Sequence, residues 1–287
     1  YASCTASIPV AQIAAAAARP ERVVGLHGVR PPDRASVLEV VRTERTAPWA
    51  VASAIALGRR LGKSVIVVGD GPGFYTRRIL APYIAEALQL LSEGVDGDLI
   101  DRALVGWGFA AGPLRMLHES GVDRAARIAH GLHAALGSRM TPPAALGALL
   151  ADERRGGSSG RGLFGRRGRD GPRAVDALDP AVYALLGVAP RTKHPEDEIA
   201  QRCALAMVNE ALQCLGDGVV HNARDGDIGA VLGLGFPAFR GGPFRHVDAM
   251  GAGDVLRRVQ AYEGRLGDRW RPAPLLVRMA RKGERFY

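Results

Sequence analysis

The sequence predicts an α/β segment at residues 1–70, followed by a mostly α-helical region over the rest of the chain. Two observations predict this fold class. Up to Val68, short apolar strands alternate with short helices. Beyond Gly73, apolar residues recur at helical spacing, and the order of helices and turns occurs twice.

The strands of the α/β segment are predicted from runs of β-branched and other apolar residues: Val23–His27, Val37–Val41 and Ser64–Val68. Its helices are predicted where Ser or Thr comes shortly before Pro: Val10–Ala18 and Thr46–Leu61. The last strand is apolar almost throughout, which predicts burial on both faces of a parallel sheet. So few strands leave backbone groups unpaired, and we therefore expect further strands before Tyr1 or in another piece.

The helical region contains an internal repeat. One apolar stripe at helical spacing comprises Leu80, Tyr83, Ile84, Ala87, Leu88 and Leu91. Its counterpart comprises Ala204, Met207, Val208, Ala211, Leu212 and Leu215. An acidic-Gly pair follows each stripe, and each copy continues to a Gly-Pro pair, Gly112-Pro113 or Gly242-Pro243. We therefore predict two helical units at residues 71–150 and 196–287, with buried stripes, and an Arg/Gly-rich linker at residues 151–195.

The composition is that of a globular protein, because 47% of the 287 residues are hydrophobic and 23% are charged, which excludes disorder along the whole chain. No apolar run approaches the roughly 18 to 20 residues of a membrane span, and the Ala14–Ala18 run has no cleavage pattern. We expect a soluble, cytoplasmic protein. The three cysteines lack metal-ligand spacing, so we expect neither a metal site nor a disulfide framework.

The basic residues behind the net charge of +9 are mostly arginines. They are densest between Arg154 and Arg173, among Gly, Ser and Pro, where the composition predicts a solvated loop. Aromatic residues make up 6% of the chain and leave little to stack on bases, so we do not expect a nucleic-acid partner. A basic surface also suits an anionic ligand such as CoA.

His27 ends a predicted strand, and Glu39 lies 12 residues later in the next one. If the strands are neighbours, Glu39 can accept a hydrogen bond from one ring nitrogen of His27. That bond would fix the tautomer and leave the other nitrogen to take a proton from a hydroxyl as a hydride leaves the same carbon. The alternative interpretation of His27 is a surface residue at a strand end.

The segment Gly69-Asp70-Gly71-Pro72-Gly73-Phe74 lies between a strand and a helix, as phosphate-binding loops do. Its spacing differs from G-x-G-x-x-G, however, and Pro72 has no N–H to donate to a phosphate. No other stretch of the sequence has that fingerprint or the P-loop pattern. We therefore expect no phosphate cradle within these residues.

Three stretches and the repeat carry a resemblance to a known family. Residues 2–7 are ASCTAS, residues 25–40 run from GLH to LEV, and residues 70–78 are DGPGFYTRR. They resemble the ASNTSS strand end, the GLHFFNP…LVEV segment and the DxPGFxxNR joint of the L-3-hydroxyacyl-CoA dehydrogenases. The repeat, with GLGFP at residues 233–237, resembles the duplicated C-terminal domain of the bacterial fatty-acid β-oxidation multifunctional α subunit.

The resemblance implies the C-terminal part of a Rossmann-type NAD-binding domain followed by two duplicated dehydrogenase C-terminal units, with the N-terminal half of the NAD domain missing. It implies NAD-dependent oxidation of an L-3-hydroxyacyl-CoA to the 3-ketoacyl-CoA, with His27 as general base and Glu39 orienting it. The substrate would sit between the sheet domain and the helical domain. The implied partners are the acyl-CoA substrate and either a thiolase subunit or the missing N-terminal portion.

Some positions depart from the family pattern. Arg77 stands where the family has a substrate-contacting Asn, and Arg30 stands where it has an Asn that faces the cofactor. At the cofactor-binding position of the first stretch Ala6 replaces a Ser, and nearby Cys4 replaces an Asn. A guanidinium only donates hydrogen bonds and is always charged. Near His27 it would disfavour the imidazolium and so weaken the base.

We therefore expect no dehydrogenase activity from the chain by itself, because the glycine-rich turn that holds NAD in the family is not among its residues. Two other functions stay open. One is an acyl-CoA-binding or assembly module without catalysis, in which arginines hold the CoA phosphates. The other is a dehydrogenase for a different 3-hydroxy acid, whose carboxylate pairs with Arg77.

Overall fold

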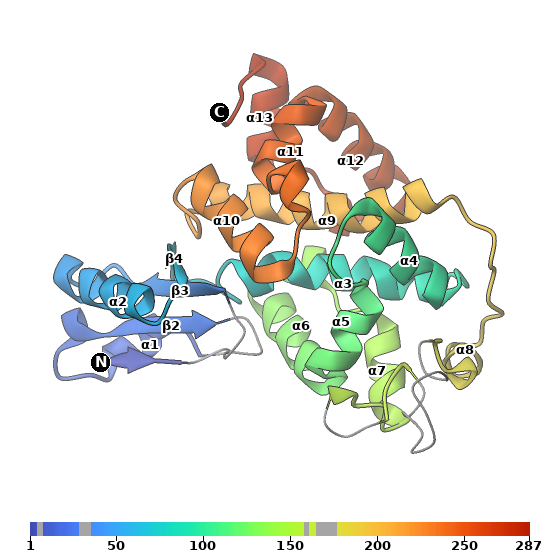
Figure 1. The fold of residues 1–287 in the computed structure, drawn as a ribbon, viewed down its shortest axis with the longest axis horizontal. Coiled ribbons are helices and arrows are strands. Elements are labelled where there is room, and N and C mark those ends of the chain that lie inside the picture. The colour runs from blue at the N-terminus through green and yellow to red at the C-terminus, as the bar shows by residue number, and fades with distance from the viewer. Residues whose placement is uncertain (5–7, 29–35, 158–160, 165–176) are drawn as a thin grey trace. The chain divides into compact units, whose positions relative to one another are not determined.

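The computed structural model describes residues 1–4, 8–28, 36–157, 161–164 and 177–287 (Figure 1). The chain divides into two compact units, which we call the sheet unit (Tyr1–Leu80 with Val208–Tyr287) and the α unit (Ala81–Met207). The division falls inside two long helices, α3 (Thr76–Ser92) and α9 (Glu196–Gly216). Each unit therefore contains one end of both helices.

The sheet unit contains a mixed sheet with the strand order β1-β2-β3-β4 among the described residues. The strands are β1 (Ala2–Ser3), β2 (Val24–Gly28), β3 (Val37–Arg42) and β4 (Ser64–Gly69). β1 pairs with β2 and β3 pairs with β4 in parallel, whereas β2 and β3 are antiparallel. The expectation of a purely parallel sheet is therefore wrong, because an apolar run does not report the direction of a strand.

Helices cover both faces of this sheet (Figure 1). α2 (Pro48–Arg60) packs on one face, where Val24, Val40 and Ala54 form a buried apolar cluster. α10 (Ala223–Leu234) packs against β3 and β4 on the other face, towards which Ile66 and Val68 point. These two side chains are buried, but the β4 residues that face α2 are only half-buried. The predicted burial of this strand is therefore complete on one face only.

Other segments of the same unit pack against the sheet. At the β4 edge, Val68 forms an antiparallel bridge with Val220, and the N–H of Gly69 donates to the carbonyl of Val219 at 2.8 Å. On one face of the sheet, α1 (Val10–Ala15) packs on β2 so closely that a Cβ at Gly25 would lie 2.8 Å from side-chain carbons of Val10 and of β3. Only glycine fits at that position.

Helices make up the rest of both units. Beyond α10, the sheet unit contains α11 (Pro243–Met250), α12 (Ala252–Leu266) and α13 (Pro274–Lys282). The α unit contains α4 (Gly97–Trp107), α5 (Pro113–Ser120), α6 (Val122–Leu136), α7 (Ala144–Ala151) and α8 (Pro180–Leu186). The predicted stripes on α3 and α9 are core, because all their members are buried except Leu80 and Leu215, which are half-buried.

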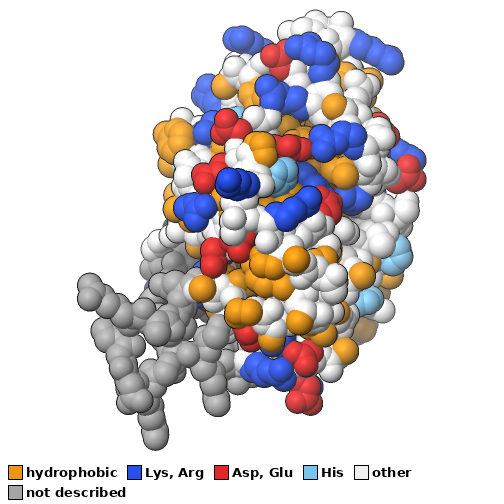
Figure 2. Space-filling view, turned by 90° about the vertical axis from the view of Figure 1, so that its right-hand side faces the viewer, with side chains coloured by type: hydrophobic (Ala, Val, Ile, Leu, Met, Phe, Trp, Pro, Cys, Tyr) orange, Lys and Arg blue, Asp and Glu red, His pale blue; other side chains and the backbone are white. Residues whose placement is uncertain are grey.

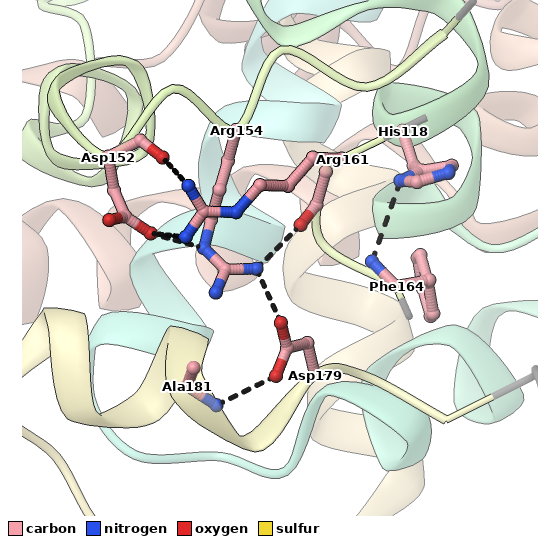
Figure 3. A network of polar contacts seen from close by, with 8 residues as sticks. His118, Asp152, Arg154, Arg161, Phe164, Asp179 and Ala181 are labelled. Carbon is pink, nitrogen blue, oxygen red and sulfur yellow. Dashed lines mark hydrogen bonds and ion pairs between the residues drawn. The ribbon is translucent and has the colours of Figure 1, made fainter. Parts of the chain in front are cut away.

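Part of the predicted Arg/Gly-rich linker is buried within the α unit (Figure 3). Arg154 is 2% exposed and donates to Asp152, to Asp179 and to the carbonyl of Gly162 at 2.7–2.9 Å. Arg161 also donates to Asp152. The expectation of a solvated loop is therefore wrong at Arg154, because protein oxygens replace the water that a guanidinium otherwise binds. Residues 165–176 lie outside the described part of the chain.

Charged groups are mixed on the molecular face drawn in Figure 2, where Lys and Arg side chains lie among Asp and Glu side chains. Such mixing gives no broad field of one sign on that face. Within the described ranges, none of the helices combines the length and the apolar character that a membrane crossing requires.

Candidate active site

His27 and Glu39 lie directly opposite each other on β2 and β3. Both side chains therefore point to the sheet face that α10 covers. The Nδ1 atom of His27 makes a hydrogen bond with Oε2 of Glu39. The contact predicted from the spacing of the two residues is thus present in the structure.

The beginning of α3 holds the Glu39 carboxylate from its other side. Oε1 accepts hydrogen bonds from the backbone N–H groups of Tyr75 (3.2 Å) and Thr76 (2.9 Å), and Oε2 accepts one from the Thr76 hydroxyl (2.9 Å). Glu39 is fully buried, so these donors replace its hydration. The exposed amides at a helix N-terminus also favour a negative charge. Glu39 therefore has a defined orientation, and its hydrogen bond orients the His27 ring in turn.

The second ring nitrogen of His27 is buried. His27 is 4% exposed, and its ring packs against Phe74 with centroids 5.4 Å apart. Nε2 is buried and has no hydrogen-bond partner among the described residues. Because a carboxylate accepts at Nδ1, we assign the ring proton to Nδ1, which leaves the Nε2 lone pair to accept a proton. A buried polar atom of this kind is a position where a ligand group can bind.

The joint between β4 and α3 turns sharply to bring its amides to Glu39. Phe74 has a φ of 52°, a left-handed conformation that costs on the order of 1 kcal/mol for a residue with a side chain. Its N–H donates to the carbonyl of Gly71, and the Asp70 carboxylate accepts from the first amides of α1. The amides of Asp70 and Phe74 therefore donate to carbonyl groups of the chain itself.

The remaining predicted site residues are Arg77, Ala6 and Arg30. Arg77 follows Thr76 in the first turn of α3 and is half-buried. Ala6 and Arg30 lie outside the described residues. The sequence analysis missed the contact of Thr76 with Glu39. A Thr at the start of a helix is a known signal for side-chain hydrogen bonding, but its acceptor is remote in the sequence.

Two family models match this chain. Residues 1–71 match the family model of the 3-hydroxyacyl-CoA dehydrogenase NAD binding domain. Residues 73–165 and 199–285 match that of the 3-hydroxyacyl-CoA dehydrogenase C-terminal domain. The chain belongs to the 3-hydroxyacyl-CoA dehydrogenase family. The resemblance found in the sequence is thereby confirmed, and NAD is the cofactor of this family's first domain.

The chain resembles curated and solved members of the family over its whole length. A fatty acid oxidation complex subunit alpha from Shewanella amazonensis is 46% identical over 289 residues, which is 100% of this chain and 40% of that protein. The chain thus spans about 40% of the length of the curated relatives it matches. The crystal structure of a 3-hydroxybutyryl-CoA dehydrogenase from Escherichia coli K12 has the same fold, with a TM-score of 0.82 and 24% identity over 98% of this chain and 75% of that chain. An (S)-3-hydroxybutyryl-CoA dehydrogenase from Ralstonia eutropha matches 58% of this chain and 60% of its own, with 30% identity and a TM-score of 0.56.

Proposed function

We propose that this chain provides the catalytic base of an NAD-dependent 3-hydroxyacyl-CoA dehydrogenase, which oxidises an L-3-hydroxyacyl-CoA to the 3-ketoacyl-CoA in fatty-acid oxidation. One observation carries the proposal. His27 is bound through Nδ1 to Glu39, while its Nε2 is buried and without a partner among the residues described. A base needs such an orienting partner and a free lone pair.

The residues of this chain would remove the proton of the substrate hydroxyl group. Nε2 of His27 takes the proton of the 3-hydroxyl group, and Glu39 stabilises the imidazolium that forms. Bound NAD would supply the hydride acceptor for the hydrogen on the same carbon. The amides of Tyr75 and Thr76 keep Glu39 in place, and the Phe74 ring shields His27 from water. In the reverse direction His27 returns the proton to the 3-keto oxygen.

The residues present fit the substrate side of an NAD-dependent site. The orphaned Nε2 of His27 is where a substrate hydroxyl would bind. The same residues do not provide the backbone donors that hold the pyrophosphate of NAD. No stretch of the sequence has the G-x-G-x-x-G pattern, and amides of the joint before α3 donate to groups of the chain itself. We therefore expect this polypeptide alone to consume no NADH.

We also infer that the two matched helical segments are duplicated copies. An arginine near the start of each long helix donates to two carboxylates from the other copy: Arg78 to Glu210 and Asp217 in the sheet unit, and Arg202 to Glu86 and Glu93 in the α unit. The same interaction thus occurs once in each unit, with the roles of the copies exchanged. This exchange supports a duplication of the two segments.

The Gly-Pro pair that begins a helix in each segment has the same physical reason in both. Asp101 accepts two backbone N–H bonds at the start of α5, and Asp227 accepts two at the start of α11. A Cβ at Gly112 would collide with Asp101, and a Cβ at Gly242 would collide with Asp227. The glycine of each Gly-Pro pair is therefore needed where an aspartate caps the next helix, which supports duplication.

The partner that we propose is a thiolase subunit. The product, a 3-ketoacyl-CoA, is the substrate for thiolytic cleavage, so direct transfer between the two enzymes would be useful. The printed names of the curated relatives describe a subunit of a fatty acid oxidation complex. Co-purification with a thiolase, followed by a shift in sedimentation, would test the assembly.

Ligand binding to the purified chain tests the function without a need for turnover. Calorimetry with L-3-hydroxybutyryl-CoA and with acetoacetyl-CoA is performed on the wild type, His27→Gln and Glu39→Gln. If Nε2 of His27 accepts a hydrogen bond from the 3-hydroxyl group, the wild type binds the 3-hydroxyacyl-CoA more tightly than either variant, because one variant lacks the imidazole acceptor and the other lacks the carboxylate that orients it. Arg77→Met is the control for the alternative substrate, because a free 3-keto acid would lose affinity with it and acetoacetyl-CoA would not.

The outcomes separate the three functions. Affinities for both thioesters that are the same in the wild type and in His27→Gln would favour a module that only binds acyl-CoA. Binding of acetoacetate but not of its thioester would favour a dehydrogenase for a free 3-hydroxy acid.

A further inference from the structure

We propose that Tyr75 is a positioning residue, whose side chain is anchored under α10 and whose backbone N–H thereby aims Glu39 at His27. The inference rests on the proposed function, because it explains how the base is held. It also gives the second helical copy a role in the sheet unit beyond packing.

The two ends of Tyr75 make contacts of different kinds. Its N–H donates to Oε1 of Glu39 at 3.2 Å, and the N–H of the next residue, Thr76, donates to the same oxygen. Its side chain is completely buried and lies in a slot on α10. A Cβ at Gly229 would be 3.1 Å from two ring carbons of Tyr75 and 2.9 Å from Ile66, and a Cβ at Gly226 would be 3.1 Å from the Tyr75 hydroxyl and 2.3 Å from Phe244. Glycine is unfavourable inside a helix, so these two glycines indicate that Tyr75 and its neighbours need to approach α10 closely.

Asp227, which follows Gly226 in α10, binds α11 and Tyr287. The Tyr287 hydroxyl donates to Asp227 at 2.9 Å, and Asp227 accepts from the amide of Phe244 at 2.8 Å. The guanidinium of Arg245 lies 3.8 Å from the centre of the Tyr287 ring. These contacts around Asp227 therefore hold α11 and Tyr287 against α10.

The anchor also explains the backbone at the joint. Phe74, which precedes Tyr75, has a left-handed conformation and packs its ring on His27. Such a conformation persists only where the surrounding structure holds it. With Tyr75 released, the joint can relax, and both the amide on Glu39 and the ring on His27 would move.

The hydroxyl of Tyr75 has no hydrogen-bond partner in the described part of the chain. The ring, rather than the hydroxyl, is therefore the anchor. Tyr75→Phe should keep the anchor, whereas Tyr75→Leu fills much of the volume but cannot span the slot. Tyr262, which packs on Trp270 with ring centroids 4.4 Å apart in the same unit, provides the matched control Tyr262→Leu.

The test measures the His27 ring directly, by nitrogen-15 NMR of histidine-labelled protein. In the wild type we expect one tautomer protonated at Nδ1, with a slowly exchanging proton. Tyr75→Phe and Tyr262→Leu should keep this signature. Tyr75→Leu should speed proton exchange by about tenfold or more and mix the tautomers.

A second pair of variants covers the case in which Tyr75→Leu does not fold. Gly229→Ala places a methyl group against the Tyr75 ring, and Gly264→Ala on α12 places one in open space. The first should disturb the His27 signals and the second should not. Wild-type signals in Gly229→Ala or Tyr75→Leu would overturn the proposal, as would equal changes in Tyr262→Leu. Because this readout needs no substrate, it stays informative if thioester binding shows that His27 is not the base.

Discussion

Replacement of Arg202 by methionine tests the strongest buried ion pair of the α unit. Arg202 is 4% exposed and donates to Glu86 at 2.7 Å, and it makes two further bonds with Glu93 at 2.6–2.7 Å. Glu86 is equally buried, whereas the side chain of Glu93 is 41% exposed. Removing one partner of a buried pair costs about 3 to 5 kcal/mol, and an exposed pair contributes less than about 1 kcal/mol. We therefore expect the loss to come mainly from Glu86, at about 3 to 5 kcal/mol.

Urea unfolding followed by circular dichroism measures this loss. Arg102→Met is the matched control in the same unit, because Arg102 and Glu196 are 3.4 Å apart and both more than half exposed. It should change the free energy of unfolding by less than about 1 kcal/mol. The double variant Arg202→Met/Glu86→Leu should regain at least about half of the loss, since no buried carboxylate is left without its guanidinium.

The reasoning would be refuted by a loss of less than about 1 kcal/mol for Arg202→Met. A double variant as unstable as the single one would equally refute it, because the cost would then arise from packing instead of from the buried charge.

Three other changes have expected outcomes. Leu88→Ala and Leu212→Ala, at fully buried positions of the two stripes, should each cost about 2 to 5 kcal/mol in urea unfolding, and a neutral effect would show that the stripe is not core. Burial raises the pKa of Asp101 from 3.8 to about 6, although hydrogen bonds from two backbone amides partly oppose the shift. Between these two pH values the native state therefore binds more protons than the unfolded state. Its contribution to stability is present below the unfolded pKa and is lost, on the order of 3 kcal/mol, as the pH rises through 6. Asp101→Asn should remove this slope from a pH series of melts, and an unchanged slope would argue against it. Arg154→Met should cost about 2 to 3 kcal/mol and Arg161→Met, whose side chain is 54% exposed, less than about 1 kcal/mol, so equal thermal shifts would contradict the burial of Arg154.

Local pattern was sufficient for most elements and allowed the contact between the two candidate catalytic residues. The predicted strands Val23–His27 and Val37–Val41 correspond to β2 and β3, because β-branched runs bounded by turns leave few alternatives. Two strands joined by a short connection are usually neighbours. The 12-residue separation of His27 and Glu39 allowed a contact between neighbouring strands, and the family resemblance supplied the reason to predict it.

Other features depend on groups that are remote in the sequence and were decided only by the tertiary structure. The burial of Arg154 needs Asp179 and the carbonyl of Gly162, and the composition of that segment instead favoured solvent. The direction of β2 relative to β3 is set by pairing, which an apolar run does not encode.

The contacts that hold Glu39 in the candidate site also depend on groups that are remote in the sequence. By itself, the sequence determined that a histidine and a glutamate at strand positions could form an oriented base, because both lie within one short strand pair. It did not determine what holds the glutamate, since the amide of Tyr75 reaches Glu39 only after the joint folds back and the ring enters the slot on α10. That slot comes from residues about 150 positions later, and close packing between such distant segments is decided by the three-dimensional fit of whole helices.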